Sequence, residues 1–322
     1  FESQGEGKYR LELEEKTRLS PKYIIYPQFE DLLGFRYQKD PENLEDVKIN
    51  LKVDYQEEKT AVFGIKPCDV QAISRLDKVF VQGVAADPFY IKRRENTLLI
   101  SVGCENVLGD CFCTSVGSSP FDFSGADIGF MGTDGLYVAF VYTAEGEELA
   151  RTYSKYFKEA GKEEIAGYKS KLEEKNRKAT EAIPGLWPDT KEEDIPDIMD
   201  KSFEDGLWEK ISEKCIGCGA CTFVCPTCYC FDIRDDKDNI EGKRYRCWDY
   251  CTSYLYTLEA SGHNPRENLS QRYRNKVNCK YNYNYKRQES LYCVGCGRCI
   301  EVCPVDMDIR EIVKKVIKNK GK

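Results

Sequence analysis

Two stretches of the sequence repeat the same spacing of cysteines. Residues 215–226 read CIGCGACTFVCP and residues 293–304 read CVGCGRCIEVCP, so each contains Cys-x2-Cys-x2-Cys-x3-Cys-Pro. This spacing is typical of bacterial proteins whose thiolates bind [4Fe–4S] clusters. The glycines between the cysteines let the backbone turn tightly beside the sulfur atoms. The pattern therefore predicts two [4Fe–4S] clusters, each of which exchanges one electron.

The fourth cysteine of each run is expected to serve the other cluster, as it does in two-cluster ferredoxins. We therefore predict that cluster 1 is bound by Cys215, Cys218, Cys221 and Cys303, and cluster 2 by Cys293, Cys296, Cys299 and Cys225. A disulfide framework is disfavoured because the chain is long and has no secretory features. Structural zinc is disfavoured because its sites use two Cys-x2-Cys pairs, whereas each run offers three cysteines followed by Cys-Pro.

A second group of cysteines lies in the N-terminal half: Cys68, Cys104, Cys111 and Cys113. Cys68 and Cys104 each follow a predicted buried strand. If those strands are neighbours in one sheet, all four thiols come to the same edge. We predict a third metal site here, with an iron–sulfur cluster favoured over zinc. The alternative is that these thiols are small buried hydrophobic groups.

The other five cysteines lie between the two runs and have no assigned role: Cys228, Cys230, Cys247, Cys251 and Cys279. They could bind metal, or they could pack around the clusters as apolar thiols, which we favour. The only histidine, His263, is interpreted as a turn residue because a proline follows two residues later. No catalytic constellation is found, so we predict no catalytic residues and no cofactor-binding residues beyond the metal ligands.

The composition narrows the class of protein. A length of 322 residues suggests about two domains. The formal net charge of −7 becomes more negative with clusters bound, which argues against nucleic acid as a partner. No apolar run is long enough to span a membrane. Seventeen cysteines suit a reducing cytoplasm, and because the chain begins at Phe1 we expect residues to be missing before it.

The N-terminal part, residues 1–143, predicts a small α/β domain. Residues 1–60 suggest irregular structure with one short helix near Phe29–Leu33. A helix is expected over Asp69–Phe80, with Asp69 as its N-cap. No dinucleotide fingerprint or Walker A pattern follows a strand. The expected strands are Ala61–Ile65, Thr97–Gly103, Ile128–Met131 and Leu136–Tyr142.

The rest of the chain predicts a connector and an enlarged α-helical ferredoxin-like dicluster domain. Residues 144–195 form the helical connector, with a break at Gly161 or Gly167. Residues 196–322 form the dicluster domain, in which an insertion of 67 residues, Pro226 to Tyr292, is expected to be mostly helical. The expected helices are Pro196–Lys214, Trp248–Gly262, Glu267–Lys280 and Ile309–Lys320.

Longer motifs carry a family resemblance over nearly the whole chain. The segments GIKPCDVQAISRLDKVF, DPFYIKRRENTLLISVGC and CFCTSVGSSPF lie in the N-terminal half, and CPTCYCFDI, RCWDYC, GHNPR and CVGCGRC lie in the C-terminal half. They resemble the β subunits of cytoplasmic NiFe sulfhydrogenases and the A subunits of anaerobic sulfite reductases. TRLSPKYIIYPQFEDLL, residues 17–33, resembles the N-terminal region of the same family.

The resemblance implies an electron-relay subunit. Its expected partners are an FAD-containing, NAD(P)-binding subunit and a hydrogenase or sulfur/sulfite reductase catalytic subunit. It also implies that the eight cysteines of the two runs are ligands. One departure is Asn275–Lys276, where we expect a His-Lys pair; it puts in doubt a polar contact of that histidine but no ligand. The alternatives are a free-standing ferredoxin-like carrier and an enzyme that uses the N-terminal metal site.

Overall fold

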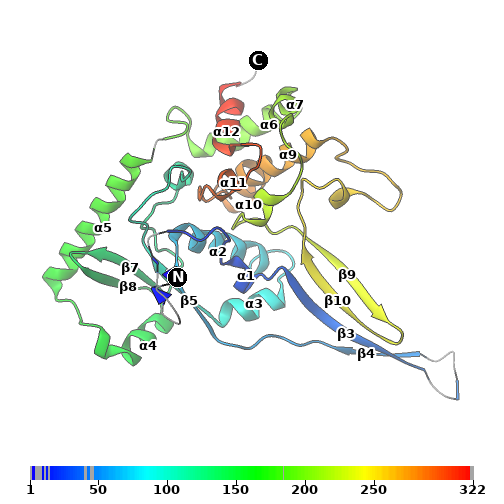
Figure 1. Ribbon diagram of the computed structural model, residues 1–322, viewed down its shortest axis with the longest axis horizontal. Helices are drawn as coiled ribbons and strands as arrows, with labels where there is room; N and C mark the ends of the chain where they lie inside the picture. The colour runs from blue at the N-terminus through cyan, green and yellow to red at the C-terminus, as the bar shows by residue number, and fades with distance from the viewer. Residues whose placement is uncertain are drawn as a thin grey trace.

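The computed structural model describes residues 2–3, 9–10, 12–13, 15–39, 42–43, 47–183 and 185–319. These residues form two four-stranded sheets and a helical C-terminal part (Figure 1). A short antiparallel pair, β1 (Glu2–Ser3) and β2 (Tyr9–Arg10), precedes them. Within the described ranges, no helix combines the length and the apolar character needed to cross a membrane.

The first sheet has the order β5-β6-β7-β8 and confirms the four predicted strands. Strands β5 (Thr60–Ile65), β6 (Thr97–Val102) and β7 (Ile128–Thr133) are parallel, and β8 (Leu136–Val141) pairs antiparallel with β7. Helices α2 (Pro67–Phe80) and α3 (Pro88–Glu95) connect β5 to β6. The carboxyl ends of β5 and β6 therefore lie side by side, directly before Cys68 and Cys104.

The predicted helix over Asp69–Phe80 is confirmed, but its predicted N-cap is wrong. Helix α2 begins at Pro67 with Lys66 as the N-cap residue. Proline at the first turn is tolerated because its missing N–H would have no partner there. Asp69 is buried and pairs with Arg298 of the second cysteine run instead.

The second sheet contradicts four predictions, the first being irregular structure over residues 1–60, which contribute two of its strands. Its order is β4-β3-β10-β9, and all its pairs are antiparallel. The predicted helix near Phe29–Leu33 is wrong because these residues begin β3, and the predicted helix Trp248–Gly262 is wrong because Trp248 ends β10 and turns follow it. The insertion is therefore not mostly helical. The bounds are β3 Phe29–Lys39, β4 Val47–Lys52, β9 Phe231–Asp238, β10 Glu241–Trp248 and a 3-10 turn, η4, Leu255–Thr257.

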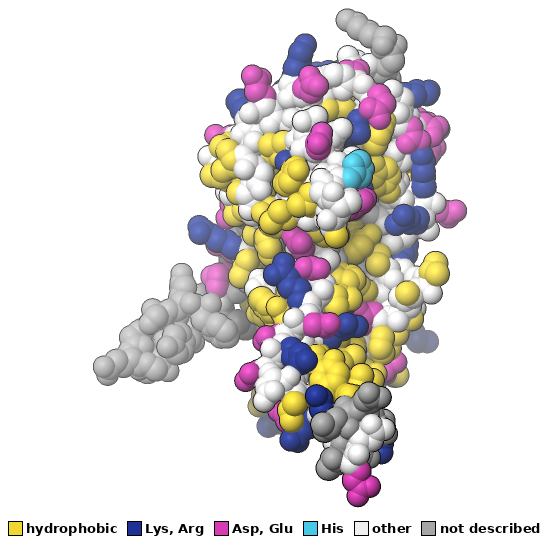
Figure 2. All heavy atoms as spheres, turned by 90° about the vertical axis from the view of Figure 1, so that its right-hand side faces the viewer, with side chains coloured by type: hydrophobic (Ala, Val, Ile, Leu, Met, Phe, Trp, Pro, Cys, Tyr) yellow, Lys and Arg dark blue, Asp and Glu magenta, His cyan; other side chains and the backbone are white. Residues whose placement is uncertain are grey.

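A buried ionic group holds this sheet against α3. The Glu30 carboxylate on β3 pairs with Arg93 and with Arg246 of β10, and Arg246 also pairs with Asp87 at the start of α3. The Arg246 guanidinium lies 4.8 Å from the ring centre of Tyr26. Buried charges are tolerated when they are paired in this way. Figure 2 views the molecule from the side of this sheet and shows charged and hydrophobic side chains interspersed on that face.

The connector is helical, and its helix is interrupted at Gly161, one of the two glycines at which a break was predicted. Helix α4 (Ala144–Thr152) and a short turn, η2 (Ser154–Tyr156), are followed by α5 (Lys162–Ala182). Gly161 is the N-cap of α5, whereas Gly167 lies inside that helix. Helix α5 runs along the edge of the molecule beside β7 and β8 and has no buried side chain (Figure 1).

Short helices make up the C-terminal part. The predicted helix Pro196–Lys214 is split into α6 (Ile195–Lys201) and α7 (Leu207–Ser212), because the Asp205 carboxylate accepts a hydrogen bond from Leu207 N at 2.8 Å. The two later helices are confirmed as α9 and α12, although Lys320 lies outside the described residues. The remaining elements are α1 Lys22–Ile25, η1 Cys113–Val116, η3 Glu192–Asp194, α8 Ala220–Phe223, α9 Leu269–Asn278, the π-helical turn η5 Cys279–Tyr283, α10 Asn284–Gln288, α11 Arg298–Glu301 and α12 Ile309–Lys318.

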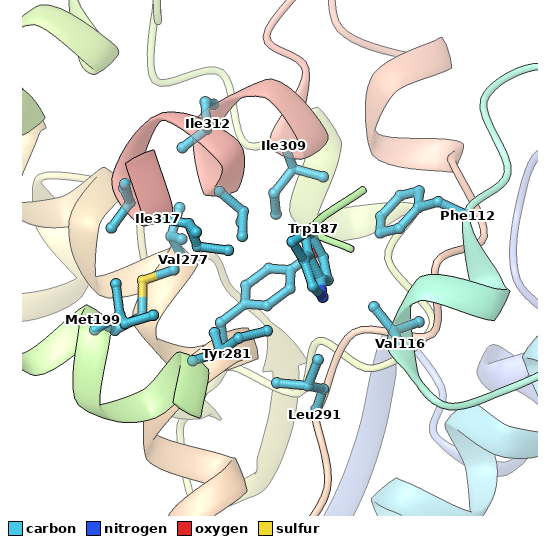
Figure 3. Packing of buried hydrophobic residues seen from close by; sticks show 14 of the residues in the cluster. Phe112, Val116, Trp187, Met199, Val277, Tyr281, Leu291, Ile309, Ile312 and Ile317 are labelled. Carbon is cyan, nitrogen blue, oxygen red and sulfur yellow. The ribbon is translucent and has the colours of Figure 1, made fainter. Parts of the chain in front are cut away.

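The largest hydrophobic core joins the two halves of the chain around the cysteine runs. Figure 3 shows α12 packed over Trp187 and Tyr281, with Phe112 approaching from the N-terminal half. The rings of Trp187 and Tyr281 meet edge to face, with centroids 6.1 Å apart. The partly buried cysteines that pack against this core are Cys215, Cys293, Cys299 and Cys303. The domain boundaries at 143 and 195 stay a prediction, since the second sheet joins strands from both sides of them.

Candidate iron–sulfur centres

Three cysteines of the first run and two of the second line a common cavity. Its sulfur-bearing walls include Cys215, Cys218, Cys221 and Cys303. Cys221 lies on α8, and Cys303 comes two residues after α11. The structure therefore brings together the four cysteines predicted for cluster 1. Cys299 and Lys276 also line this cavity.

A second cavity is lined by the four cysteines predicted for cluster 2. Cys225, Cys293, Cys296 and Cys299 line it, with Lys276 and Lys280. Helices α8 and α11, one from each run, pack against each other. The fourth cysteine of each run therefore lies in the cavity of the first three cysteines of the other run. Both ligand sets stay predictions, and the described geometry suits them.

Backbone N–H groups point at the sulfur atoms of both runs. Gly217 N donates to Cys215 Sγ and Gly295 N donates to Cys293 Sγ, each at 3.4 Å. Met307 N donates to Cys303 Sγ at 3.2 Å. Such donors stabilise negative charge on sulfur and so influence the potential of a bound cluster. Both glycines have φ above 60°, a conformation that side chains other than glycine rarely adopt.

The four N-terminal cysteines also converge. Cys68, Cys104, Cys111 and Cys113 line a third cavity, together with Lys16, Gly295 and Cys296. Phe112 N donates to Gly295 O at 2.8 Å, and a Cβ on Gly295 would lie 2.5 Å from Cys113 N. The loop that carries Cys111 and Cys113 therefore lies directly on the second run. Burial raises the pKa of the Cys104 thiol to about 11 and that of Cys113 to about 12.

A buried ion pair fixes Cys68 relative to the second run. The Arg298 guanidinium donates to both carboxylate oxygens of Asp69, at 2.9 and 2.7 Å, and Ser20 Oγ donates to the same carboxylate at 2.8 Å. The two charged side chains are 1% and 2% exposed. Burial, together with the neighbouring Asp69 carboxylate, raises the pKa of Cys68 well above its ordinary value. The Asp69–Arg298 ion pair thus links the residue next to Cys68, which lines the third cavity, to the start of α11.

Three buried lysines lie among the sulfur atoms. Lys276 Nζ contacts Cys221 Sγ, and Lys280 Nζ donates to Thr227 Oγ1 at 2.9 Å. Lys22 Nζ donates to the carbonyl oxygens of Cys225 and Cys228 at 2.8 and 2.7 Å. All three side chains are 4% exposed or less. None of the ion pairs found among the described residues gives these lysines a carboxylate partner.

The lysines indicate that an anion belongs in these cavities. A buried ammonium group costs several kcal/mol unless negative charge compensates it. Burial acts to lower the pKa of Lys276 and Lys280, but the adjacent thiolates outweigh it and raise both pKa values. A [4Fe–4S] cluster with four thiolates carries a net charge of about −2. The donor set therefore fits iron–sulfur clusters.

Sequence reasoning missed these cations. The signal that could have found them is the residue spacing from α9 into η5, which places Tyr273, Lys276, Val277 and Lys280 three or four residues apart in sequence. A face that carries two apolar residues and continues into a buried turn is expected to be buried throughout. The single histidine, His263, lies exposed in a turn (Figure 2).

A single metal ion suits the described thiols poorly. Within the described ranges, no three His, Cys, Asp or Glu side chains converge closely enough to hold one ion. The thiols instead stand around the walls of cavities. That arrangement is the one expected for a multi-iron cluster, whose ligands bind different iron atoms.

Comparison with known proteins agrees with this geometry. Residues 214–307 match the family of 4Fe-4S dicluster domains. Sulfhydrogenase 2 subunit beta of Pyrococcus furiosus is 34% identical over 261 residues, which is 80% of this chain and 74% of that protein. No solved structure matches the chain. The chain therefore belongs to the sulfhydrogenase beta subunit family, as an iron–sulfur electron-transfer subunit with a 4Fe–4S dicluster domain.

Proposed function

We propose that the chain relays single electrons through three [4Fe–4S] clusters held in a row by the three cavities. The observation that supports the row is that neighbouring cavities share wall residues. Cys296 lines both the third and the second cavity. Cys221, Cys299 and Lys276 line both the second and the first. The order is therefore N-terminal cavity, cluster 2, cluster 1.

The proposed partners lie at the two ends of this row. One is an FAD-containing subunit that exchanges electrons with NAD(P)H, and the other is a hydrogenase or sulfur/sulfite reductase catalytic subunit. The matched Pyrococcus furiosus protein is by name one subunit of a sulfhydrogenase, which supports a multisubunit assembly for this chain too. Iron–sulfur clusters take one electron each, so a series of them suits a two-electron flavin.

The first cavity offers one place for electron exchange with a partner. Cys218 is exposed, and the side chain of Ile216 beside it is 63% exposed. Cys296, on the wall between the second and third cavities, is buried. An apolar exposed residue next to an exposed ligand suits a docking contact that excludes water from the point of transfer.

Association and reduction together test the relay. We expect the chain to purify in a stable complex with a flavoprotein, and NAD(P)H to reduce its clusters in that complex, as measured by electron paramagnetic resonance. A monodisperse chain that associates with no flavoprotein would instead support a free-standing carrier. Turnover of a substrate by the isolated chain would support an enzyme.

Serine substitutions test the N-terminal site. Cys68→Ser, Cys104→Ser, Cys111→Ser and Cys113→Ser should each lose the same number of irons, about four, because all four thiols enclose one cavity. A double variant should lose no more than a single one. Cys247→Ser, on β10 and outside the three cavities, is the control. Full iron content in all four variants would reduce the relay to two clusters.

The buried lysine beside cluster 1 should raise its reduction potential. Lys276→Met should lower that potential by on the order of 50–100 mV, since a nearby positive charge favours the more negative, reduced state. Lys286→Met is the matched control because Lys286 lies nearby in the sequence, on α10, but is half-exposed and paired with Asp200. Redox titration of the spectroscopic signals measures both. Equal potentials for the two variants would contradict an electrostatic role for Lys276.

A further inference from the structure

We propose that Lys280 and Thr227 form a hydrogen-bond chain that ends on the sulfur atom of Cys225 and raises the reduction potential of cluster 2. All three residues line the cavity of the cysteines predicted for cluster 2. The inference rests on cluster 2 of the proposed electron relay and assigns a role to two side chains that are not metal ligands. It does not depend on the N-terminal site.

The Thr227 hydroxyl lies between a positive charge and a predicted ligand sulfur. Lys280 Nζ donates to Thr227 Oγ1 at 2.9 Å, and Thr227 Oγ1 lies 3.5 Å from Cys225 Sγ. Thr227 is fully buried and Lys280 is 3% exposed, so bulk water does not compete for these contacts. The three groups therefore form a continuous chain from an ammonium group to a sulfur atom.

The donor and acceptor properties of the groups give the chain its direction. An ammonium group has three N–H donors and no acceptor, so the Thr227 oxygen accepts from Lys280. A cysteine bound to a cluster is a thiolate without a proton, so Cys225 can only accept. The single hydroxyl proton of Thr227 is therefore donated to Cys225 Sγ. The ammonium group strengthens this donation, because hydrogen bonds in a chain polarise one another.

The backbone holds both side chains in place. Thr227 lies in the turn after Cys225, where Cys228 N donates to Cys225 O at 3.3 Å. Lys280 lies in η5, and its carbonyl oxygen accepts a hydrogen bond from Tyr292 N at 2.8 Å. The Lys280 ammonium group also lies 4.8 Å from the ring centre of Tyr292. The chain thus joins two fixed segments that are 53 residues apart in sequence.

The second cysteine run has no hydroxyl at the equivalent position. Its fourth cysteine begins the sequence Cys303-Pro304-Val305, whereas the first run reads Cys225-Pro226-Thr227. Val305 lines the first cavity, as Thr227 lines the second. The Cys303 sulfur accepts from the backbone N–H of Met307 instead. The side-chain hydrogen bond therefore distinguishes cluster 2 from cluster 1, and valine is compatible with this Cys-Pro turn.

Replacing Thr227 with valine tests the inference in the full chain, purified without oxygen. A hydrogen bond to a cluster sulfur stabilises the more negative, reduced state. In Thr227→Val the ratio of reduced to oxidised cluster 2 at a fixed potential should fall about tenfold, equivalent to about 59 mV for a one-electron couple. Thr227→Ser keeps the hydroxyl and should keep the wild-type potential. Redox titration followed by electron paramagnetic resonance measures the ratio, with cluster 2 signals identified as those that Cys225→Ser removes.

A buried threonine outside the cavities provides the matched control. Thr222 belongs to the same cysteine run and is 2% exposed, but it lines none of the three cavities described above. Thr222→Val removes an equally buried hydroxyl, so it should leave the potential of cluster 2 unchanged. An equal shift in Thr222→Val and Thr227→Val would overturn the inference, because the shift would then report general repacking.

A double-mutant cycle tests whether Lys280 acts through Thr227. Lys280→Met should also lower the potential of cluster 2, because it removes the positive charge and the polarisation of the hydroxyl. If the chain is continuous, Thr227→Val should lower the potential less in a Lys280→Met background than in the otherwise unchanged protein. Additive shifts would show that the two side chains act independently and would overturn the chain.

Iron content separates this inference from the electron relay on which it rests. An unchanged potential in Thr227→Val, with full iron content, would overturn the inference and leave the relay standing. Absence of cluster 2 from the wild-type protein would overturn both. Thr227→Ala is the second variant and should reproduce the shift of Thr227→Val. Loss of cluster 2 from both variants would show that the hydroxyl is needed for assembly rather than for the potential, and would also overturn the inference.

Discussion

Replacing Cys303 with serine should remove the cluster held by the first run and leave the second-run cluster in place. Cys303 belongs to the second run by sequence, but it lines the cavity of Cys215, Cys218 and Cys221. A cluster that keeps only three of its four thiolates is expected to be lost or degraded. Iron content should fall by about four atoms per chain, and only one of the two sets of dicluster signals should disappear.

The reciprocal variant is the control for this prediction. Cys225→Ser should remove the second-run cluster, because Cys225 lines the cavity of Cys293, Cys296 and Cys299. Resolved electron paramagnetic resonance spectra of both variants measure the outcome. Loss of the second-run signals in Cys303→Ser would refute the crossed ligand sets. Both variants should also lose stability, since each cluster joins two segments separated by the 67-residue insertion.

The cysteine spacing predicted more of the candidate site than of the fold around it. Ligand spacing is local, so the runs could be recognised from a few residues each. The strands Ala61–Ile65 and Thr97–Gly103 could also be predicted, because both are short apolar runs, and they pair in parallel. Only the second is a buried strand, since β5 lies at the sheet edge and Phe63 is exposed. The adjacency of the two strands then brought Cys68 and Cys104 together, as the sequence predicted.

The second sheet could not be predicted from hydrophobic pattern because it has almost none. In β3 the large apolar residue Phe29 is 71% exposed, whereas the charged residue Glu30 is buried. Phe29, Leu32 and Leu33 also match helical spacing, which favoured the wrong element. Glu30 tolerates burial only because Arg93 and Arg246 neutralise it, and Arg246 lies more than 200 residues away in the chain. Such long-range pairing leaves no local signal.

The buried cations are a second feature that sequence reasoning cannot assign locally. Lysine is ordinarily a surface residue, and Lys22 looks like any other in its polar segment. Its ammonium becomes buried because the carbonyl oxygens of Cys225 and Cys228 face it. Lys276 is buried against the sulfur atom of Cys221 instead. In each case the lysine's partner is an atom of a cysteine residue near the clusters. The burial of these lysines can therefore be predicted only once the cysteine sites are placed in space.

Asn in place of Asp69 should destabilise the protein by about 3–5 kcal/mol, the cost of leaving a buried charge without its partner. The substitution keeps the shape of the side chain and removes only its charge. Arg298 would stay charged, because the guanidinium is not deprotonated in proteins, and it would keep its bond to Thr17 O at 2.8 Å. The loss therefore measures one uncompensated buried cation.

A matched exposed pair provides the control. Asp235 also accepts two hydrogen bonds from an arginine, Arg244, both at 2.7 Å, but both side chains are nearly half-exposed. Exposed pairs contribute about 0–1 kcal/mol, so Asp235→Asn should barely change stability. Midpoints of thermal and guanidinium unfolding, followed by loss of cluster absorbance, compare the two variants at one heating rate.

The apolar double variant Asp69→Leu with Arg298→Met distinguishes two roles of the ion pair: the balance of buried charge and the placement of Cys68. Replacing a buried ion pair by apolar side chains is often neutral, so this variant should regain most of the stability that Asp69→Asn loses. It should not regain the geometry of the N-terminal cavity, because the pair also holds Cys68 against the second run. We therefore expect near-native unfolding midpoints with altered N-terminal cluster signals. If Asp69→Asn shifts the midpoint no more than Asp235→Asn does, the pair does not hold the two halves together.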